Sequence, residues 1–382
     1  VATFEKAKEI LKANLSETGE NVIFVMQTVT VPADTTLELT MADIPNGAIL
    51  RHTTNSGYFF YVYGTVNVHD VVLDGNRQAF AYSSTHNAMF RVDKGGTLHL
   101  QEGTVAQNIR GSSQSVVYVY GAKDTTNTVI VDDLTVVNGI ETYVSTMTET
   151  SGTNIFYLTG AAGGAINLTV NGGTITGNQA RLLYVTYSSD NHLVFNGGTF
   201  SDNTVAGPGA VFLGSYTTNV TNTVLDINGG TYANNRSVST STSYGYGGIA
   251  YLKLDAEINL NGGSFTGNAA SALAGAKGDG ITLRSPGTKY TATINLNALN
   301  QDMTLFLHDQ SKTVNNTWAV VTGPLTHTVT VYNQYPTDGF VVAKGTEDYA
   351  LTEADLAKLV PGTEGISFRL DTENNAICIV AE

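Results

Sequence analysis

The chain has little cysteine, few basic residues and no long apolar run. Its single cysteine, Cys378, has no partner for an internal disulfide, so packing and backbone hydrogen bonds must stabilise the fold. Only 19 lysines and arginines stand against 33 aspartates and glutamates in 382 residues, and the net charge of −14 repels nucleic acid and anionic lipid. No apolar run approaches the roughly 20 residues of a membrane span. The sequence therefore predicts a protein that neither binds nucleic acid nor inserts into a membrane.

Helix-forming residues are also scarce in the middle of the chain. Ala, Leu, Glu and Lys do not accumulate there as helices would require. The chain instead has 40 glycines, 19 tyrosines and many Thr, Asn and Val residues, a composition that favours strands and tight turns. The composition predicts an all-β protein.

An eleven-residue pattern recurs along the chain. It reads LTVNGGTITGN from Leu168 and returns as LVFNGGTFSDN, LDINGGTYANN and INLNGGSFTGN. The residue that follows each short strand marks eight repeats: His69, Gln101, Asp132, Asn171, Asn196, Asn228, Asn261 and Asn297. Their intervals of 32, 31, 39, 25, 32, 33 and 36 residues are typical of a solenoid that absorbs insertions in loops, whereas propeller blades keep a steadier length.

Each repeat has room for three short strands. One comes earlier, as in FYVYG from Phe60, one precedes the marker, and one follows the NGG turn, as at residues 174–176. This arrangement predicts a right-handed parallel β-helix with three short strands per coil, in which like strands stack about 4.8 Å apart.

The repeated residues have structural roles in such a coil. Leu168 and Val170 are expected to face the core, and Gly172 and Gly173 to supply unusual backbone angles. Seven residues past most markers stands an asparagine, which tolerates the left-handed conformation and bonds to neighbouring backbone. The predicted asparagine column comprises Asn76, Asn108, Asn178, Asn203, Asn235 and Asn268.

Both ends of the predicted rod carry segments expected to close it. Residues 4–16 have apolar side chains at helical spacing and predict a capping helix. Near the C-terminus, LTEADLAKLV has Thr352 as a helix N-cap, and ISFRLDTENNAICIV predicts a hairpin. We expect one continuous domain: an N-terminal cap and first coil over 1–50, β-helix coils over 51–310, and the last coils with a C-terminal cap over 311–382.

The NGGTITGN-type coils, over about Val66 to Asn300, and the LTEADLAKL and SFRLDTENNAICI segments carry a family resemblance. They resemble the pectate-lyase-like superfamily of right-handed β-helices, and more closely the non-catalytic modules of bacterial surface proteins. The resemblance implies a secreted, adhesin-like protein at the bacterial cell surface that meets polysaccharide or a host surface. Because no cleavable signal is visible, we expect any secretion signal or anchor to lie outside this segment.

Outward residues of the first strand in each coil form a column. They stand between inward apolar residues, and they are Tyr61, Arg91, Tyr118, Tyr157, Tyr184, Phe212, Tyr251 and Thr282. The six aromatic ones are a candidate ligand-binding strip, suited to stacking against sugar rings or a partner's aromatic side chains. The alternative is a structural ladder, because cross-strand aromatic pairs stabilise sheets on their own account.

The turn position that later coils fill with glycine is acidic in the early coils. It holds Asp70, Glu102 and Asp133. Stacked carboxylates offer oxygen ligands for Ca²⁺, so the three are a candidate metal site, and no other cofactor is expected. Paired carboxylates also serve glycoside hydrolysis. An ordinary acidic turn is the alternative interpretation.

Three functions stay open. The first is a non-enzymatic surface rod that presents the aromatic column to a glycan or to a host or partner protein. The second is a polysaccharide lyase or glycoside hydrolase using Asp70, Glu102, Asp133 and Arg91, although the outward strand positions do not match the active site of either class. The third is a structural spacer or self-associating extracellular subunit. The sequence favours the first.

Overall fold

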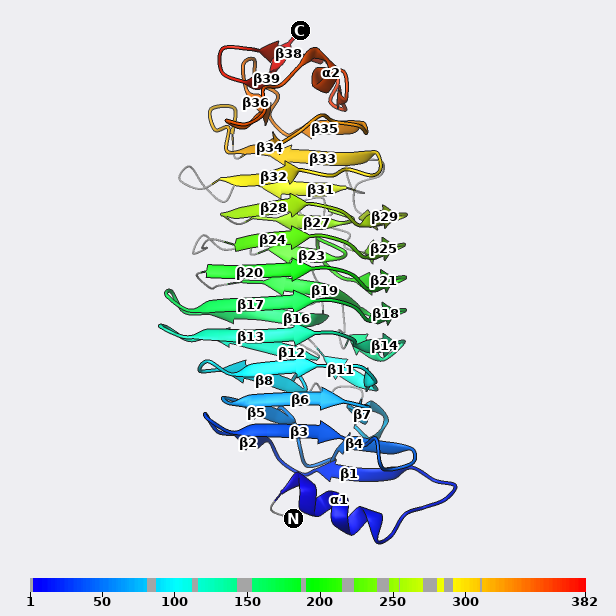
Figure 1. Cartoon of the computed structure of the whole chain (residues 1–382). Helices are drawn as coiled ribbons and strands as arrows, with labels where there is room; N and C mark the ends of the chain where they lie inside the picture. Colours follow the sequence, from blue (N-terminus) through cyan, green and yellow to red (C-terminus); the bar gives the residue numbers. More distant parts are fainter. Residues whose placement is uncertain are drawn as a thin grey trace.

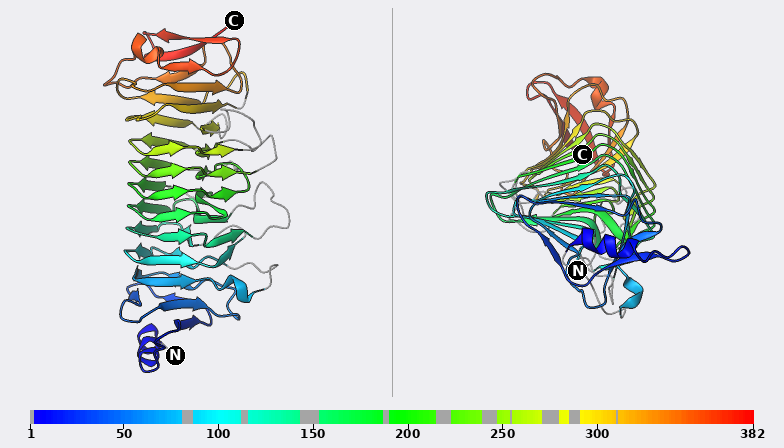
Figure 2. Two further views of the ribbon diagram at one scale, coloured as in Figure 1. Left: turned by 90° about the vertical axis from the view of Figure 1, so that its right-hand side faces the viewer. Right: turned by 60° about the horizontal axis from the view of Figure 1, so that its bottom comes forward.

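The computed structural model describes residues 3–80, 87–111, 116–142, 153–186, 190–214, 223–238, 247–253, 255–270, 280–284, 291–309 and 311–382. These residues form a rod of stacked strands with the two termini at opposite ends (Figure 1). The same stacking is visible after a quarter turn of the rod, and the oblique view from the N-terminal end shows the strands of successive coils lying over one another (Figure 2). Within the described residues, no helix is long and apolar enough to span a membrane.

Three long sheets run along the rod, and we name them sheets A, B and C; sheet A ends at β29, whereas sheets B and C continue to the C-terminal end. Sheet A contains, in order, β1 (Asn21–Val25), β4 (Gly47–Arg51), β7 (Val71–Asp74), β10 (Thr104–Gln107), β14 (Thr135–Val137), β18 (Thr174–Thr176), β21 (Thr199–Ser201), β25 (Thr231–Ala233) and β29 (Ser264–Thr266). Its neighbouring strands are parallel, as in the pairing of Thr174 with Thr199.

Sheet B has more strands than sheet A, and it carries the predicted aromatic column. It contains β2 (Val29–Val31), β5 (Phe60–Val62), β8 (Phe90–Asp93), β12 (Val117–Gly121), β16 (Thr153–Gly160), β19 (Ala180–Val185), β23 (Phe212–Gly214), β27 (Ala250–Leu252), β31 (Ile281–Arg284), β33 (Met303–His308), β35 (Val329–Asn333) and β37 (Leu359–Pro361). Its neighbouring strands are parallel among the described residues, as in the pairing of Tyr118 with Tyr157.

Sheet C carries the residues that precede each marker. It contains β3 (Thr36–Thr40), β6 (Thr65–His69), β9 (Thr97–Leu100), β13 (Thr126–Val131), β17 (Ala165–Val170), β20 (Asp190–Phe195), β24 (Thr223–Ile227), β28 (Ala256–Leu260), β32 (Ala292–Leu296), β34 (Thr317–Val321), β36 (Val341–Lys344), β39 (Ala376–Ala381) and β38 (Ile366–Asp371). Two small sheets lie beside these: β11 (Ile109–Gly111) with β15 (Ile140–Thr142), and β22 (Thr204–Val205) with β26 (Arg236–Ser237) and β30 (Ala269–Ala270). The prediction of an all-β solenoid of parallel strands is confirmed.

The core is a set of apolar columns inside the rod. Leu168 and Val170 of β17 are 1% and 4% exposed, as their alternation predicts. Val170 pairs in register with Val131 of the preceding coil and Phe195 of the following one. Burying such a side chain contributes about 1.5–3 kcal/mol, and every coil repeats the contribution. One coil therefore stabilises the next through the same inward positions.

The two glycines of the NGG turn have different roles. A Cβ on Gly197 would lie 2.6 Å from the carbonyl oxygen of Asn171 in the preceding coil, so the first glycine permits close approach of two backbones. Gly198 instead has φ of +94°, which disfavours other residues. The prediction that both glycines supply unusual angles is therefore wrong for the first, whose requirement is steric.

The N-terminal helix α1 (Phe4–Lys12) lies beside the first strand at the end of the rod (Figure 1). The predicted helix is confirmed, and it ends at Lys12 rather than at residue 16. Lys8 and Lys12 both contact Asp43, and the hydrogen bonds from Lys12 and Lys8 lower the pKa of Asp43 to about 2. These ion pairs anchor α1 to the first coil.

The opposite end is closed by α2 (Glu353–Leu356) and the β38–β39 hairpin, both of which the sequence predicts. Thr352 caps α2, and Asp355 completes the capping box by bonding back to the Thr352 backbone at 2.9 Å. β39 pairs antiparallel with β36, and β38 pairs antiparallel with β39. The parallel stacking of sheet C therefore ends in an antiparallel hairpin. A short 3-10 helix, η1 (Arg77–Ala79), is the remaining helical element described.

Candidate functional site

The predicted column is formed over five successive coils of sheet B, four of which contribute a tyrosine. Tyr61, Arg91, Tyr118, Tyr157 and Tyr184 are successive register partners on β5, β8, β12, β16 and β19. Their side chains are half-buried on the outward face, because the residues on either side point into the core. We call Tyr61, Tyr118, Tyr157 and Tyr184 the tyrosine strip.

The rings of the strip pack against one another along the rod. The ring centroids of Tyr118 and Tyr157 are 5.5 Å apart, and those of Tyr157 and Tyr184 are 5.1 Å apart with an interplanar angle of 28°. The Tyr118–Tyr157 pair is tilted at 40°, and in both pairs each ring covers part of its neighbour's face. Burial raises the pKa of the Tyr118 hydroxyl, which keeps it a neutral hydrogen-bond donor.

Arg91 interrupts the strip and is held in a cage of rings. Its guanidinium lies 5.4–5.8 Å from the ring centroids of Tyr58, Tyr61, Tyr118 and Tyr120. Its Nη2 donates to Asp93 Oδ2 at 2.9 Å. Burial alone would lower the pKa of Arg91, but the hydrogen bond and charge of Asp93 raise it. Arg91 is therefore a charged ion-pair partner that orders the rings around it.

Sequence reasoning missed further tyrosines that pack against the strip. Tyr58 precedes β5 and stacks on Tyr118 at 6.0 Å, and Tyr63 stacks on Tyr61 at 6.0 Å. For Tyr63 and Tyr120 the signal is in the segments FYVYG and VYVYG, where a second tyrosine follows the first at a spacing of two and so lies on the same face. The aromatic surface is consequently two columns wide at this end.

Phe212 and Tyr251 do not extend the exposed column. Phe212 is completely buried and pairs in register with the inward Leu183, so the prediction that it faces outward is wrong. Its ring lies 5.2 Å from that of Phe195 in the core. Tyr251 occupies the outward register position but is also completely buried. Thr282, its register partner, is buried as well.

The three acidic turn residues precede neighbouring strands of sheet A: Asp70 stands before β7, Glu102 before β10 and Asp133 before β14. Asp70 has φ of 47° and its Oδ2 lies 3.0 Å from Nδ1 of the adjacent His69, while Glu102 is exposed. Within the described ranges, which include all three acids, no group of three or more His, Cys, Asp and Glu side chains is placed to hold a metal ion. The calcium site at these residues stays a prediction, and it carries no part of the function proposed below.

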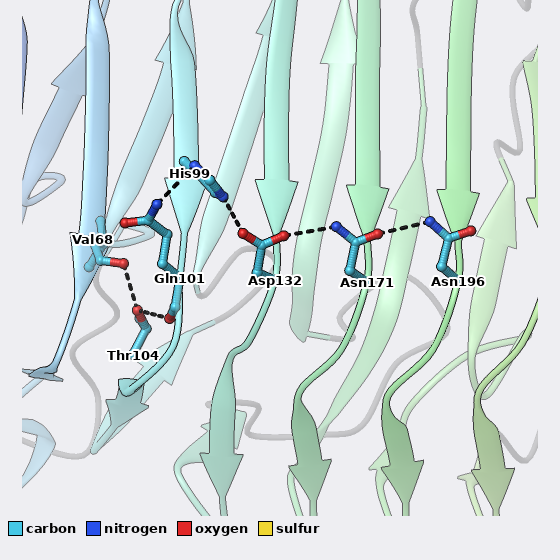
Figure 3. Close-up of polar contacts among 7 residues, drawn as sticks. All are labelled: Val68, His99, Gln101, Thr104, Asp132, Asn171 and Asn196. Carbon is cyan, nitrogen blue, oxygen red and sulfur yellow. Dashed lines mark hydrogen bonds and ion pairs between the residues drawn. The ribbon is translucent and has the colours of Figure 1, made fainter.

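Asp132 directly precedes Asp133 in the sequence. It belongs to a chain of side-chain hydrogen bonds that we call the outer ladder (Figure 3). His99 Nε2 lies 2.5 Å from Asp132 Oδ2, and Asn171 Nδ2 donates to Asp132 Oδ1 at 2.8 Å. Hydrogen bonds from Asn171 and His99 lower the pKa of Asp132. Each following member donates to the one before it: Asn196, Asn228, Asn261 and Asn297, and then the hydroxyl of Thr322.

A second, buried ladder runs seven residues farther along each repeat. The inner ladder comprises Asn178, Asn203, Asn235 and Asn268. Each Nδ2 donates to a backbone carbonyl, as from Asn203 to Ile175 at 3.1 Å, and all but that of the last member, Asn268, also donate within the ladder. The stacked column is confirmed for these four residues, but the left-handed angle falls one residue earlier, as at Asp202 (φ 56°). Of the six asparagines in the predicted column, Asn76 and Asn108 are the two that have the left-handed conformation themselves.

Comparison of the chain with protein-family models, with curated proteins and with solved structures finds no match.

Proposed function

We propose that this chain is a non-enzymatic, adhesin-like module of a bacterial cell-surface protein that binds a glycan along the tyrosine strip. The proposal includes a right-handed β-helix of three strands per coil and an extracellular location. The observation that carries it is the run of Tyr118, Tyr157 and Tyr184 on three successive coils, half-buried and in register. A row of aromatic residues on a flat parallel sheet offers an extended polymer one equivalent contact per coil.

The ring geometry favours contact through hydroxyls. Because the rings stack on each other, a sugar cannot lie flat on most of their faces. The hydroxyls repeat at the spacing of the strands, about 4.8 Å, and can donate to or accept from sugar hydroxyls. In this proposal the strip is both the ladder and the binding surface, since packing orders the rings and the hydroxyls contact the ligand.

The experiment is a glycan-array measurement with wild type and a Tyr118→Phe, Tyr157→Phe, Tyr184→Phe triple variant. Phenylalanine keeps the stacked rings and removes only the hydroxyls. Three hydrogen bonds at about 0.5–1.5 kcal/mol each predict at least a roughly tenfold loss of affinity with an unchanged unfolding midpoint. The matched control is Tyr335→Phe, a half-buried tyrosine outside the strip.

Two outcomes contradict the proposal in different ways. Wild-type protein that binds no glycan overturns glycan binding itself. Equal binding by wild type and the triple variant overturns the contact through hydroxyls.

A second candidate function, self-association, is favoured by the N-terminal end. An apolar groove of about 960 Å³ lies there between α1 and the first strands. Phe24, Met26 and Val29 are 51%, 53% and 42% exposed beside it. Light scattering of wild type and a Phe24→Ser, Met26→Ser variant tests this candidate: a concentration-dependent oligomer that the variant abolishes supports it, and a wild-type monomer at every concentration excludes it.

A further inference from the structure

Four repeats of the outer ladder carry the dipeptide Asn-Gly where the chain leaves sheet C for sheet A. The pairs are Asn171–Gly172, Asn196–Gly197, Asn228–Gly229 and Asn261–Gly262. Each asparagine is exposed, and each glycine that follows it is half-buried. The side chains of Asn171 and Asn196 lie in one row along the rod (Figure 3). The same chemical group therefore recurs from coil to coil in nearly the same surroundings.

An asparagine that precedes a glycine can convert itself to aspartate without an enzyme. The backbone nitrogen of the glycine loses its proton and attacks Cγ of the asparagine, and the new C–N bond closes a succinimide ring. The bond from Cγ to the side-chain nitrogen breaks, and that nitrogen takes up a proton and leaves as ammonia. Water then opens the ring at either carbonyl, which gives aspartate or isoaspartate. Glycine favours the attack because it has no Cβ to hinder it.

The hydrogen bond of the glycine N–H decides how available this nitrogen is. In one pair, the Gly229 N–H donates to the carbonyl oxygen of Phe195 in the preceding coil at 3.2 Å. Among the contacts of the described residues, the N–H groups of the other three glycines donate no hydrogen bond: Gly172, Gly197 and Gly262. A nitrogen held in a backbone hydrogen bond must first break that bond. The structure therefore divides one repeated dipeptide into three available pairs and one restrained pair.

The asparagine side chains do not differ in the same way. Asn196 and Asn228 each donate through Nδ2 to the preceding member of the ladder and accept at Oδ1 from the following one, in every case at 2.8 Å. Both side chains are exposed, so water can reach the ring that hydrolysis must open. Asn228 is therefore an internal control for Asn196, since the two pairs differ in the bond of the glycine nitrogen.

We propose that Asn171, Asn196 and Asn261 are sites of spontaneous deamidation in the folded protein, and that Asn228 is restrained. The ladder accommodates the product, because an aspartate, Asp132, already occupies the equivalent place one coil before Asn171 and accepts from it at 2.8 Å. A carboxylate accepts hydrogen bonds but cannot donate them, so each conversion removes one bond of the ladder and adds one negative charge. The inference goes beyond the proposed function, because it concerns a change of the chain itself rather than a ligand of the tyrosine strip.

Two further Asn-Gly pairs lie outside the ladder, at Asn46 and Asn138. The N–H of Gly47 donates to a backbone carbonyl at 3.1 Å, and the N–H of Gly139 donates to the side-chain oxygen of Asn178 at 2.9 Å. Both pairs are therefore restrained, and we expect them to react more slowly than the three available pairs. They extend the comparison to turns of a different shape.

The test is peptide mass spectrometry of the full folded chain during incubation in a mildly alkaline buffer. Deamidation raises the mass of the peptide, and chromatography separates isoaspartate from aspartate. We expect Asn171, Asn196 and Asn261 to react roughly twofold to tenfold faster than Asn228, since one backbone hydrogen bond distinguishes the two groups. Equal rates at Asn196 and Asn228 in the folded chain would overturn the proposal, and so would the absence of reaction at the three available pairs.

The same measurement on the chain unfolded in urea separates the structure from the local sequence. Unfolding removes the bond of the Gly229 N–H, so Asn228 is expected to react as fast as the other three. A difference that persists in urea would assign the rates to neighbouring residues and contradict the structural argument.

The matched variant is Asn196→Gln, which keeps a side-chain amide but closes the ring more slowly. It is expected to abolish the mass change at this position in the folded chain and to leave the rate at Asn261, two coils away, unchanged. A mass change that persists at the substituted position would exclude the succinimide route and overturn the proposal.

Discussion

The two asparagine ladders use one residue type in one repeat and yet differ in almost every contact. The inner ladder is buried, and its side chains bond backbone as well as each other, whereas the outer ladder is exposed and its side chains bond mainly each other. They also run in opposite directions: Asn178 donates to Asn203 of the following coil, while Asn196 donates to Asn171 of the preceding one. Identical letters in a repeat therefore do not imply equal contributions to stability.

The two ladders differ in whether water can replace their hydrogen bonds. Asn203 is 1% exposed, so no solvent can satisfy the groups that it bonds. The amides of the outer ladder stand in water, which competes for each hydrogen bond. We therefore expect the inner ladder to hold the coils together and the outer ladder to add little.

The largest expected effect is the loss of an inner-ladder amide. Asn203→Ala removes the donor to Ile175 and Asn235 and the acceptor for the backbone N–H of Asn178. Leaving buried polar groups unsatisfied is expected to lower the free energy of unfolding by about 3 kcal/mol. Guanidinium unfolding followed by circular dichroism measures it. The matched variant Asn196→Ala in the outer ladder should cost only about 0.5 kcal/mol, and equal costs would refute the distinction between the ladders.

An intermediate effect is expected at the turn that joins the ladders. Gly197→Ala places a Cβ against the carbonyl of Asn171, and Gly198→Ala forces a positive φ on alanine. Each should lower the unfolding free energy by about 2 kcal/mol. Gly323→Ala is the control, because a Cβ there meets no atom within 4 Å, and it should change stability by less than about 0.5 kcal/mol. Thermal unfolding of the three variants distinguishes a steric requirement from a loss of chain flexibility, which would affect all three alike.

The smallest effect concerns the charged end of the outer ladder. Because the folded-state pKa of Asp132 lies below its ordinary value of 3.8, the contacts from Asn171 and His99 stabilise the fold above about pH 4. This contribution disappears as the pH falls through the folded-state pKa. The gap in melting temperature between wild type and Asp132→Asn should therefore narrow from pH 7 to pH 2. Asn196→Ala, which removes no charge, should show a gap that stays constant, and a constant gap for Asp132→Asn would contradict the assignment.

Much of the fold follows from the sequence because one coil repeats the constraints of the next. The inward column through Leu168 and Val170, the capping helix at Thr352 and the final hairpin depend on local patterns, and all are formed. The prediction that Phe212 faces outward is wrong for a physical reason. In VFLGS the residues on both faces of the strand are apolar, so alternation cannot decide which face is buried. Packing against Phe195 decides it instead.

The candidate site was only partly predictable. The tyrosines stand out because each polar-tipped ring lies between apolar neighbours. The sequence places Asp70, Glu102 and Asp133 in neighbouring coils but does not fix where their carboxylates point, so the calcium site stays a prediction. The intervals between coils are irregular, so neighbours such as Arg284 and His308 are identified only when the strand register is known.

The ladders also bear on how the chain folds. Their hydrogen bonds join residues only 25 to 39 positions apart, although the rod is 382 residues long. Each coil therefore needs only its neighbours, and folding can start at one coil and spread to both ends. A chain built in this way can gain or lose a whole repeat during evolution while the remaining coils keep their contacts.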